Sequence, residues 1–247
     1  WSATFNGGEP VPYVYKENRQ DFYEISNGDY LEVIDQTGML VSCTFADNVT
    51  PKDIGAVDDS SGYPLVDSES GAEKVFKIPG NAGPAPVIGI KEGCFEGVSG
   101  IIDYIVALKI EDGSQITQIE DGVFSGAKNL KYVYIGDSVK SIGNDAFSNC
   151  GALKIAEIGS GVTSIGNSAF ENCNNLVEIA FDNPVDGAAS FPISNIGDKA
   201  FSTNGPKLTI YGKIDGAYGP FEWAMQPGNY MNQNNGLRVC YKSAKDD

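Results

Sequence analysis

Hydrophobic residues recur along the middle of the chain with a spacing that repeats from one segment to the next. Each segment opens with two aliphatic residues three positions apart, and a phenylalanine follows the second of them by five positions. The pairs are Val87/Ile90, Ile116/Ile119, Val139/Ile142, Val162/Ile165 and Ile193/Ile196, and the phenylalanines are Phe95, Phe124, Phe147, Phe170 and Phe201. Internal repeats of this length indicate stacked supersecondary units. We therefore expect about five stacked coils with a ladder of phenylalanine rings inside.

The second half of each segment follows the pattern L-x-x-φ-x-φ, in which φ is an apolar residue. Leu130/Val133/Ile135, Leu153/Ala156/Ile158 and Leu176/Ile179/Phe181 fit it, and Leu208/Ile210 align with its last two apolar positions in a shortened final unit. Alternation with a period of two is typical of a strand with one face inward. A unit this short cannot bury its apolar face alone, so the units must share one core. Glycines such as Gly143 and Gly166 are expected where the chain turns sharply, because glycine tolerates unusual backbone angles.

Two cysteines occupy the same position of adjacent units. Residues 142–150 align without a gap with residues 165–173, which places Cys150 above Cys173. Neighbouring strands lie ~4.8 Å apart, a separation that allows a disulfide. A buried ladder of small side chains is the favoured alternative, since the neighbouring units place Ala127 and Asn204 there and cysteine is among the most buried residue types. With five cysteines and no C-x-x-C, the chain shows neither a disulfide framework nor a zinc motif.

The first 86 residues lack the repeat. Residues 30–34 and 39–45, separated by Asp35-Gln36-Thr37-Gly38, predict a β-hairpin whose second arm places Met39, Val41, Cys43 and Phe45 on one side. Residues 11–15 suggest another strand, and residues 78–84 a linker. We expect a small β-rich cap over residues 1–86, since a solenoid exposes an apolar end unless something covers it. The solenoid is then predicted over residues 87–224, followed by a C-terminal cap strand and tail over residues 225–247.

The run I-G-x-x-A-F-x-N-C-x-x-L-x-x-I-x-I, seen at residues 165–181 with Phe181 in its last position and in near-identical form at residues 142–158, resembles the BspA-like leucine-rich repeat of bacterial surface proteins. The resemblance covers about residues 87–224, because Leu208-Thr209-Ile210-Tyr211-Gly212 and the residues up to Ala224 are similar to the terminating unit of such arrays. It implies a curved leucine-rich repeat solenoid with a parallel sheet on one face. It also implies an exported, surface-displayed protein, with the export signal or lipid anchor lost upstream of Trp1, and members that are mostly linked to adhesion.

Composition narrows the function further. Seventeen Lys and Arg against 33 Asp and Glu give a net charge of −16, which disfavours binding to nucleic acid. The chain contains no histidine, so it lacks the commonest general base and the Ser-His-Asp arrangement. No apolar run approaches the ~20 residues that span a membrane. We expect no enzyme and no cofactor, because no motif singles out a catalytic carboxylate pair.

Residues between the apolar positions of each strand are expected to face outward. One such column holds Lys109, Tyr134, Glu157, Ala180 and Thr209, and a second holds Ala107, Tyr132, Ile155 and Glu178. Tyrosines beside charged residues are a composition favoured at binding sites. We therefore take Tyr132, Tyr134, Lys109, Glu157 and Glu178 as a candidate binding patch, with an ordinary solvated sheet surface as the alternative.

Two acidic loops, residues 58–62 and 67–71, are candidates for calcium, although they lack the EF-hand pattern and a solvated loop is favoured. The expected function is a non-enzymatic binding scaffold that recognises an extracellular protein through the strand face. A glycan-binding module using the same aromatic rings and a structural spacer in a larger surface protein are the alternatives. The sequence does not indicate the ligand or the oligomeric state.

Overall fold

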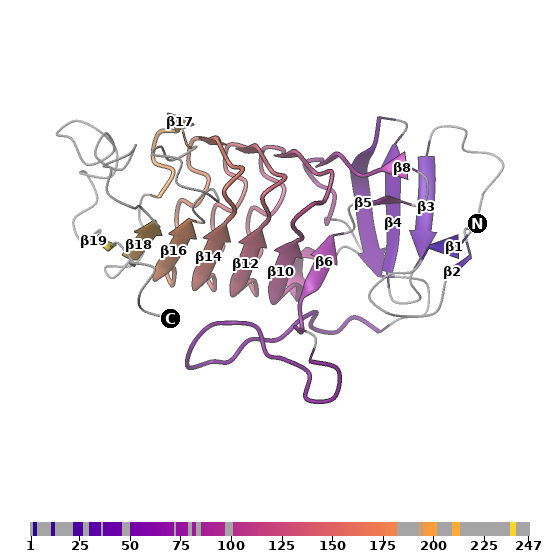
Figure 1. Cartoon of the computed structure of the whole chain (residues 1–247), viewed down its shortest axis with the longest axis horizontal. Helices are drawn as coiled ribbons and strands as arrows, with labels where there is room; N and C mark the ends of the chain where they lie inside the picture. The colour runs from indigo at the N-terminus through magenta and orange to yellow at the C-terminus, as the bar shows by residue number, and fades with distance from the viewer. Residues whose placement is uncertain are drawn as a thin grey trace.

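The fold is a β-solenoid with a small β-rich region at its N-terminal end (Figure 1). The computed structural model describes residues 2–3, 11–12, 22–26, 30–35, 37–45, 50–71, 73–78, 81–82, 85–96, 101–181, 193, 195–201, 209–212 and 238–240. Two long sheets carry the architecture, and the described residues include no α-helix, only the 3-10 turn η1 (Ile102–Tyr104). The predicted repeat solenoid is confirmed.

The first sheet has seven parallel strands, one from each successive turn of the chain. In spatial order they are β19 (Arg238–Cys240), β18 (Thr209–Gly212), β16 (Glu178–Phe181), β14 (Ile155–Ile158), β12 (Tyr132–Ile135), β10 (Ala107–Ile110) and β6 (Phe76–Ile78). The φ-x-φ residues point inward, since both apolar positions of β10, β12 and β14 are buried. Ile78, which the sequence suggested as the start of a linker, instead ends β6 and pairs with Ile110.

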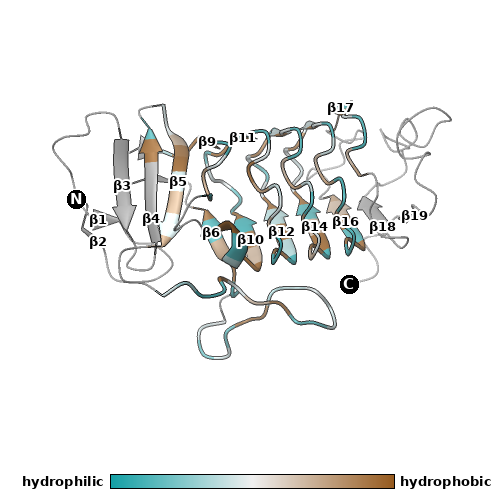
Figure 2. Ribbon diagram, turned by 180° about the vertical axis from the view of Figure 1, so that it is seen from behind, coloured by the Kyte–Doolittle hydropathy of each residue, from teal (hydrophilic) through white to brown (hydrophobic). Residues whose placement is uncertain are grey.

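The second sheet has eight strands and lies along the opposite side of the coils (Figures 1 and 2). Its solenoid strands are β17 (Asn195–Ile196), β15 (Ser164–Ile165), β13 (Ser141–Ile142), β11 (Gln118–Ile119) and β9 (Gly89–Ile90), followed by β5 (Met39–Phe45), β4 (Tyr30–Asp35) and β3 (Phe22–Ser26). Two short antiparallel pairs complete the fold: β1 (Ser2–Ala3) with β2 (Val11–Pro12), and β7 (Asn81–Ala82) with β8 (Ala85–Pro86).

The phenylalanines form a continuous stack along the axis of the solenoid. Successive ring centroids from Phe95 to Phe201 lie 4.9, 5.0, 5.1 and 5.7 Å apart, with interplanar angles of 21° or less. The backbone supports the stack, because the amides of Phe124, Phe147 and Phe170 donate to the next coil at 2.7–2.8 Å. Each ring therefore contributes both apolar burial and a fixed stacking contact, worth ~0.5–1.5 kcal/mol per pair beyond burial.

Cys150 and Cys173 lie in the same core as thiols. The Cys150 Sγ–H donates to the carbonyl of Phe124 and the Cys173 Sγ–H to that of Phe147, both at 3.1 Å. Both residues are fully buried, with Ala127 one coil earlier. Hydrogen bonding to Cys173 and burial raise the pKa of the Cys150 thiol. This geometry is that of the small-residue ladder, not of a disulfide.

The turns of the coils are held by a second ladder, built from amides. The Asp121 carboxylate accepts the amide of Asn144 at 2.7 Å, and the Asn144 side chain accepts that of Asn167 at 2.8 Å. Unusual backbone angles, the expected reason for Gly143 and Gly166, are not the cause, because neither residue has a positive φ. Glycine is needed at both positions because a Cβ there would come within 2.5–2.6 Å of the preceding coil's backbone.

The predicted hairpin is present and joins the solenoid as an extension of the second sheet. β4 and β5 pair antiparallel, and β5 then runs parallel to β9. The expected alternation along the second arm is wrong at Val41, which is half-buried, while Leu40 is fully buried. The register shift between Val33 and Ile34 explains this, because a bulge reverses which side chains face the core. Tyr13 and Tyr15 of the suggested N-terminal strand lie outside the described residues.

Candidate binding face of the seven-stranded sheet

The strand register fixes which side chains share a column on the outer face of this sheet. Lys77, Lys109, Tyr134, Glu157 and Ala180 form the first column. Its next member is Tyr211, not Thr209 as expected, because β18 pairs Ile210 with Ile179. The alignment of Leu208/Ile210 with the last two apolar positions was therefore wrong by two residues.

The second column holds Ala107, Tyr132, Ile155, Glu178 and Thr209. The expectation that this column faces solvent is wrong over β10 to β14. Tyr132 is only 4% exposed, Ile155 2% and Ala107 0%. Their cover comes from the N-terminal region, which the repeat pattern does not include.

The covering segment is residues 54–75, which we call the strap. It runs beside the strands of the seven-stranded sheet (Figure 1). Its first residue, Ile54, is almost fully buried and pairs with Ile105 beside β10. The Ile54 amide donates to the Tyr104 carbonyl at 2.7 Å, and the Ile54 carbonyl accepts the Val106 amide at 2.8 Å. At its other end the strap continues directly into β6.

The strap closes a second, small apolar cluster on the outer face. Val57 of the strap packs with Val106, Ala107, Tyr132 and Ile155, and Val75 lies against the same cluster. Gly62 approaches so closely that a Cβ there would lie 3.0 Å from the Ile155 Cδ1. The Tyr63 ring lies 6.0 Å from the Tyr132 ring. Apolar side chains at outward positions thus mark where the strap docks.

Polar contacts tie the strap to β16 and to the residues just before β12 and β14. Lys131 Nζ lies 3.0 Å from the Asp59 carboxylate and Lys154 Nζ donates to the Asp59 carbonyl at 2.9 Å. The hydrogen bond from Lys131 lowers the pKa of Asp59. The Tyr63 hydroxyl donates to Glu178 Oε1 at 2.9 Å. Glu178, a candidate binding residue, therefore holds the strap over β16.

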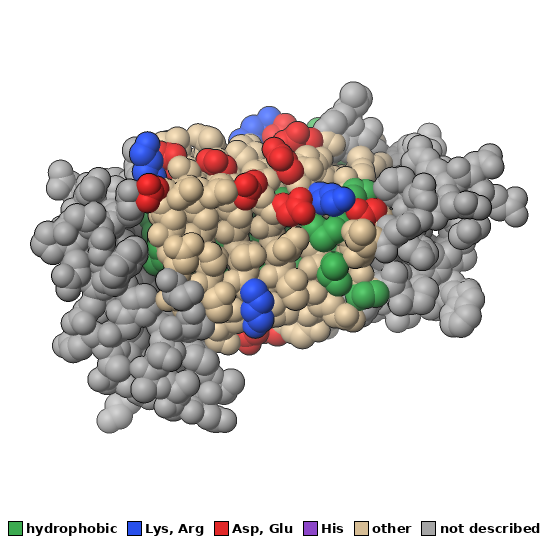
Figure 3. Space-filling model, turned by 90° about the horizontal axis from the view of Figure 1, so that it is seen from above, with side chains coloured by type: hydrophobic (Ala, Val, Ile, Leu, Met, Phe, Trp, Pro, Cys, Tyr) green, Lys and Arg blue, Asp and Glu red, His purple; other side chains and the backbone are tan. Residues whose placement is uncertain are grey.

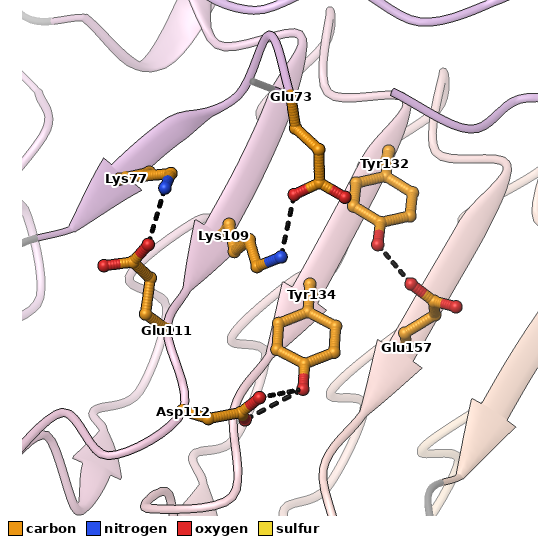
Figure 4. Close-up of polar contacts among 8 residues, drawn as sticks. All are labelled: Glu73, Lys77, Lys109, Glu111, Asp112, Tyr132, Tyr134 and Glu157. Atoms are coloured by element: carbon orange, nitrogen blue, oxygen red, sulfur yellow. Dashed lines mark hydrogen bonds and ion pairs between the residues drawn. The ribbon is translucent and has the colours of Figure 1, made fainter. Parts of the chain in front are cut away.

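Near β6 and β10 the face carries a cluster of tyrosines, lysines and carboxylates (Figure 4). Lys109 Nζ lies 2.7 Å from Glu73 of the strap and 4.9 Å from the centre of the Tyr134 ring, a cation–π distance. The Tyr134 hydroxyl donates to both Asp112 oxygens at 2.8 Å. Lys77 pairs with Glu111 at 2.6 Å. Glu73 and Asp112 were not among the predicted site residues, since neither belongs to the repeated strand pattern.

Tyr132 and Glu157 form the innermost polar contact of this cluster. The Tyr132 hydroxyl donates to Glu157 Oε2 across adjacent strands. Burial and this carboxylate raise the pKa of Tyr132 above its usual value of 10, because both disfavour the phenolate. Of the five candidate residues, Tyr132 is thus buried support, while Tyr134, Lys109, Glu157 and Glu178 are half-buried around it.

The two acidic loops lie in the strap, and their first aspartates bind their own backbones. Asp58 Oδ1 accepts the amides of Ser60 and Ser61 at 2.9 and 2.8 Å, and Asp67 Oδ1 those of Glu69 and Ser70 at 3.0 and 2.9 Å. The Ser60 hydroxyl and these amides lower the pKa of Asp58 to about 2. These carboxylates therefore close turns; calcium binding by the loops stays a prediction.

Large exposed hydrophobic residues gather on the strap rather than on the coils. Among the described residues they are Tyr63, Leu65, Val66, Ile88 and Val177. Seen from above, the coils present mainly uncharged atoms with scattered acidic side chains, and hydrophobic side chains lie toward the hairpin end (Figure 3).

Within the described part of the chain, no helix has the length and apolar character required to cross a membrane.

Comparison with known proteins places the repeats in a family. Residues 83–210 match the model of the BspA type leucine rich repeat region in six copies. A leucine rich cell surface protein from Faecalibacterium prausnitzii is 20% identical with a TM-score of 0.35, and the match covers 78% of this chain and 55% of that one. A leucine-rich repeat protein from Bacteroides capillosus is 20% identical with a TM-score of 0.37, over 77% and 98% of the chains.

The pneumococcal vaccine antigen PcpA is 17% identical with a TM-score of 0.41, over 78% of this chain and 50% of that one. This chain therefore spans about half the length of PcpA and of the Faecalibacterium protein. Comparison with curated proteins gives no match. Since the family model covers more than half of the sequence, the chain belongs to the family of proteins with BspA-type leucine-rich repeats.

Proposed function

We propose that the protein is a non-enzymatic scaffold, displayed on or secreted from a bacterial cell, that binds an extracellular protein with the outer face of the seven-stranded sheet. The observation that carries the proposal is a contrast between the two faces of the strands. Inward positions repeat from coil to coil, whereas the first outward column changes from Lys109 to Tyr134, Glu157 and Ala180. Stacking of the coils requires the inward residues to repeat but places no such requirement on the first outward column. Residues that vary from coil to coil are what a recognition surface needs.

Tyr134, Lys109, Glu157 and Glu178 are the proposed contact residues, and Tyr132 supports them from below. Tyrosine and charged side chains around a partly buried centre are the usual composition of a protein-binding patch. Surface display is what the family implies for this chain. The absence of histidine from the sequence is consistent with a scaffold that carries out no chemistry.

A protein ligand is favoured over a glycan because stacking on a sugar needs an open ring face. The Tyr132 ring is buried under Tyr63, and Lys109 lies over the Tyr134 ring. The two rings that motivated a glycan site are therefore both occupied. A spacer role has no particular observation in its favour.

The test is to probe the full chain against purified secreted and cell-surface proteins and, in parallel, against a glycan array. We expect binding to a protein and none to glycans, with at least tenfold weaker affinity for the double variant Tyr134→Ala/Glu178→Ala. Lys140→Ala, which alters an exposed residue directly before β13 of the other sheet, is the matched control and should bind normally. Binding to glycans alone, or unchanged affinity of the double variant, would contradict the proposal.

A further inference from the structure

The strap has an internal order of its own, with a period of nine residues. Its sequence repeats as Val-Asp-x-x-Ser-Gly at residues 57–62 and 66–71, and the next valine in the series is Val75. The residues before the three valines, Ala56, Leu65 and Lys74, form a closed ring of backbone hydrogen bonds. Leu65 donates to Ala56, Lys74 to Leu65 and Ala56 to Lys74, each at 2.8 Å. The strap is thus a pseudo-threefold unit rather than an irregular loop.

The three related valines have unequal surroundings. Val57 is buried in the outer-face cluster and Val75 packs against it. Val66 is 58% exposed, the largest exposure among the large hydrophobic residues of the described chain. Because the ring of hydrogen bonds holds all three arms in place, Val66 cannot turn to the sheet while the other two remain docked. The third arm therefore presents a rigid apolar side chain to solvent.

Val66 is accompanied by other exposed apolar residues. Tyr63 is 37% exposed and Leu65 40% exposed, so three of the five large exposed hydrophobic residues in the described chain lie within four positions. We call Tyr63, Leu65 and Val66 the strap tip. Exposed apolar residues close together in sequence on an ordered segment favour an interaction site, since little conformational entropy is lost when a partner binds them.

The charge around the strap tip indicates what kind of partner it fits. The strap carries five carboxylates and a single lysine, and Asp58, Asp67 and Glu69 lie in the two turns beside the tip. The Ser60 hydroxyl and the turn amides lower the pKa of Asp58, and the turn amides lower the pKa of Asp67, so both carboxylates remain charged across the physiological range. The whole chain has a net charge of −16, which opposes association of two copies.

We propose that the strap tip is a docking site for a protein segment that places an apolar side chain on Val66 and Leu65 and surrounds it with lysine or arginine. This rests on the proposed function, for which it names a second contact surface and the chemistry of the partner. The apolar contact supplies affinity, and the acidic turns select basic flanks and speed association.

The test uses a display library of random twelve-residue peptides selected on the full chain. We expect enriched peptides with a central apolar residue and basic flanks, whose binding weakens as salt rises. Val66→Asp and Leu65→Asp should each lower their affinity at least tenfold. The matched control is Ile88→Asp, because Ile88, at 37%, is nearly as exposed as Leu65, at 40%, but lies beside the hairpin. Thermal unfolding of Val66→Asp should be unchanged, since the side chain lies mostly in solvent.

Enriched peptides without basic residues, or binding that survives both strap-tip substitutions, would overturn the docking site. If such peptides were instead lost with Tyr134→Ala, the strand-face function would stand and only the strap-tip proposal would fail. A dimer that Val66→Asp converts to a monomer would also overturn it, because the occupant would then be a second copy. A selection that enriches no peptide would overturn the strap-tip proposal alone, because the strand-face function is tested separately against purified proteins.

Discussion

The Tyr63 ring lies 6.0 Å from the Tyr132 ring, and this pair joins the N-terminal strap to the second strand of the repeats. Each of the two hydroxyls reaches a glutamate on a further strand, Glu178 for Tyr63 and Glu157 for Tyr132. The pair thus couples β12, β14 and β16 to a segment more than 60 residues earlier in the chain. The docking of the strap therefore determines how much of the candidate face is exposed.

Replacing Tyr63 by alanine is expected to uncover Tyr132 without unfolding the coils. The ring pair contributes ~0.5–1.5 kcal/mol beyond its burial, which is enough to loosen the strap but not the core. Nitration by tetranitromethane, mapped by mass spectrometry, should spare Tyr132 in the unaltered protein and modify it in Tyr63→Ala. Tyr134, which is half-buried, should react in both proteins; equal protection of Tyr132 in both would contradict this role of Tyr63.

Tyr132→Phe should change how stability depends on alkaline pH. The pKa of Tyr132 is raised in the folded state, so the folded protein holds its proton more tightly than the unfolded chain. Its stabilisation is therefore complete below pH ~10 and is lost as pH rises beyond it. We expect Tyr132→Phe to lower the unfolding free energy by about 1 kcal/mol at pH 8 and to flatten the decline above pH 10. Urea denaturation at several pH values measures this; Tyr134→Phe should keep the decline.

Asp35→Asn should weaken the junction between hairpin and solenoid and alter the acid limb of stability. Burial acts to raise the pKa of Asp35, but hydrogen bonds from Lys91, Thr37 and Met39 outweigh it and hold the pKa at about 2. A lowered folded-state pKa stabilises the protein above pH ~4, and this contribution is lost as pH falls from about 4 to 2. We expect a loss of about 1–2 kcal/mol at pH 7 and a flatter acid limb.

The control for Asp35 is Asp103→Asn, because Asp103 pairs with Lys128 at the same 2.7 Å but on the open surface. Such pairs contribute ~0–1 kcal/mol, so its unfolding free energy should barely change. Equal losses for the two variants would show that burial at the junction is irrelevant.

Phe147→Ala should cost about 3–5 kcal/mol of unfolding free energy, the range for removing a buried phenylalanine. Phe147 is fully buried between rings at 5.0 and 5.1 Å, so the gap cannot be filled by either neighbour without breaking another stack. Phe147→Leu keeps most of the volume and should cost roughly half as much. Chemical denaturation checks both variants, and a loss below ~1 kcal/mol for alanine would refute the ladder as the centre of the core.

The thiols of Cys150 and Cys173 should resist alkylation in the folded protein and react fully after unfolding without reductant. Both are buried, and the pKa of Cys150 is raised, so little nucleophilic thiolate forms. Peptide mapping after iodoacetamide treatment, before and after addition of guanidinium chloride, measures this. Recovery of a peptide in which the two are linked would establish the disulfide alternative instead.

The coils could be predicted from sequence because one repeated pattern specifies core, strand and register together. The gapless match of the units around Ala146 and Ala169 leads directly to the pairing of β13 with β15 and of β14 with β16. Beyond that match, the predicted alignment of Leu208 and Ile210 is wrong by two residues. Leu208 and Gly212 bracket Ile210 symmetrically, so alternation alone could not decide which neighbour takes the position of Phe181.

The strap could not be placed from the repeat pattern, because the residues of its polar side-chain contacts lie 36 to 115 positions away in the chain and the strap itself is not part of the repeat. A signal was nevertheless present. Ala107 and Ile155 are apolar at positions that the alternation assigns to solvent, and both are buried by the strap. Apolar residues at outward positions of a solenoid strand therefore indicate that another segment of the chain covers them.

Ile54 and Phe76 both lie beside β10, so the chain leaves and re-enters the sheet next to the same strand. The segment between them is an insertion whose two ends are held close together by their pairing beside β10. A segment of another length can bridge the same two ends at little cost in closure entropy, since loop closure depends only weakly on length. Any replacement must still cover Ala107, Tyr132 and Ile155, so the variable part of this insertion is the exposed arm around Val66 and not the arms that carry Val57 and Val75.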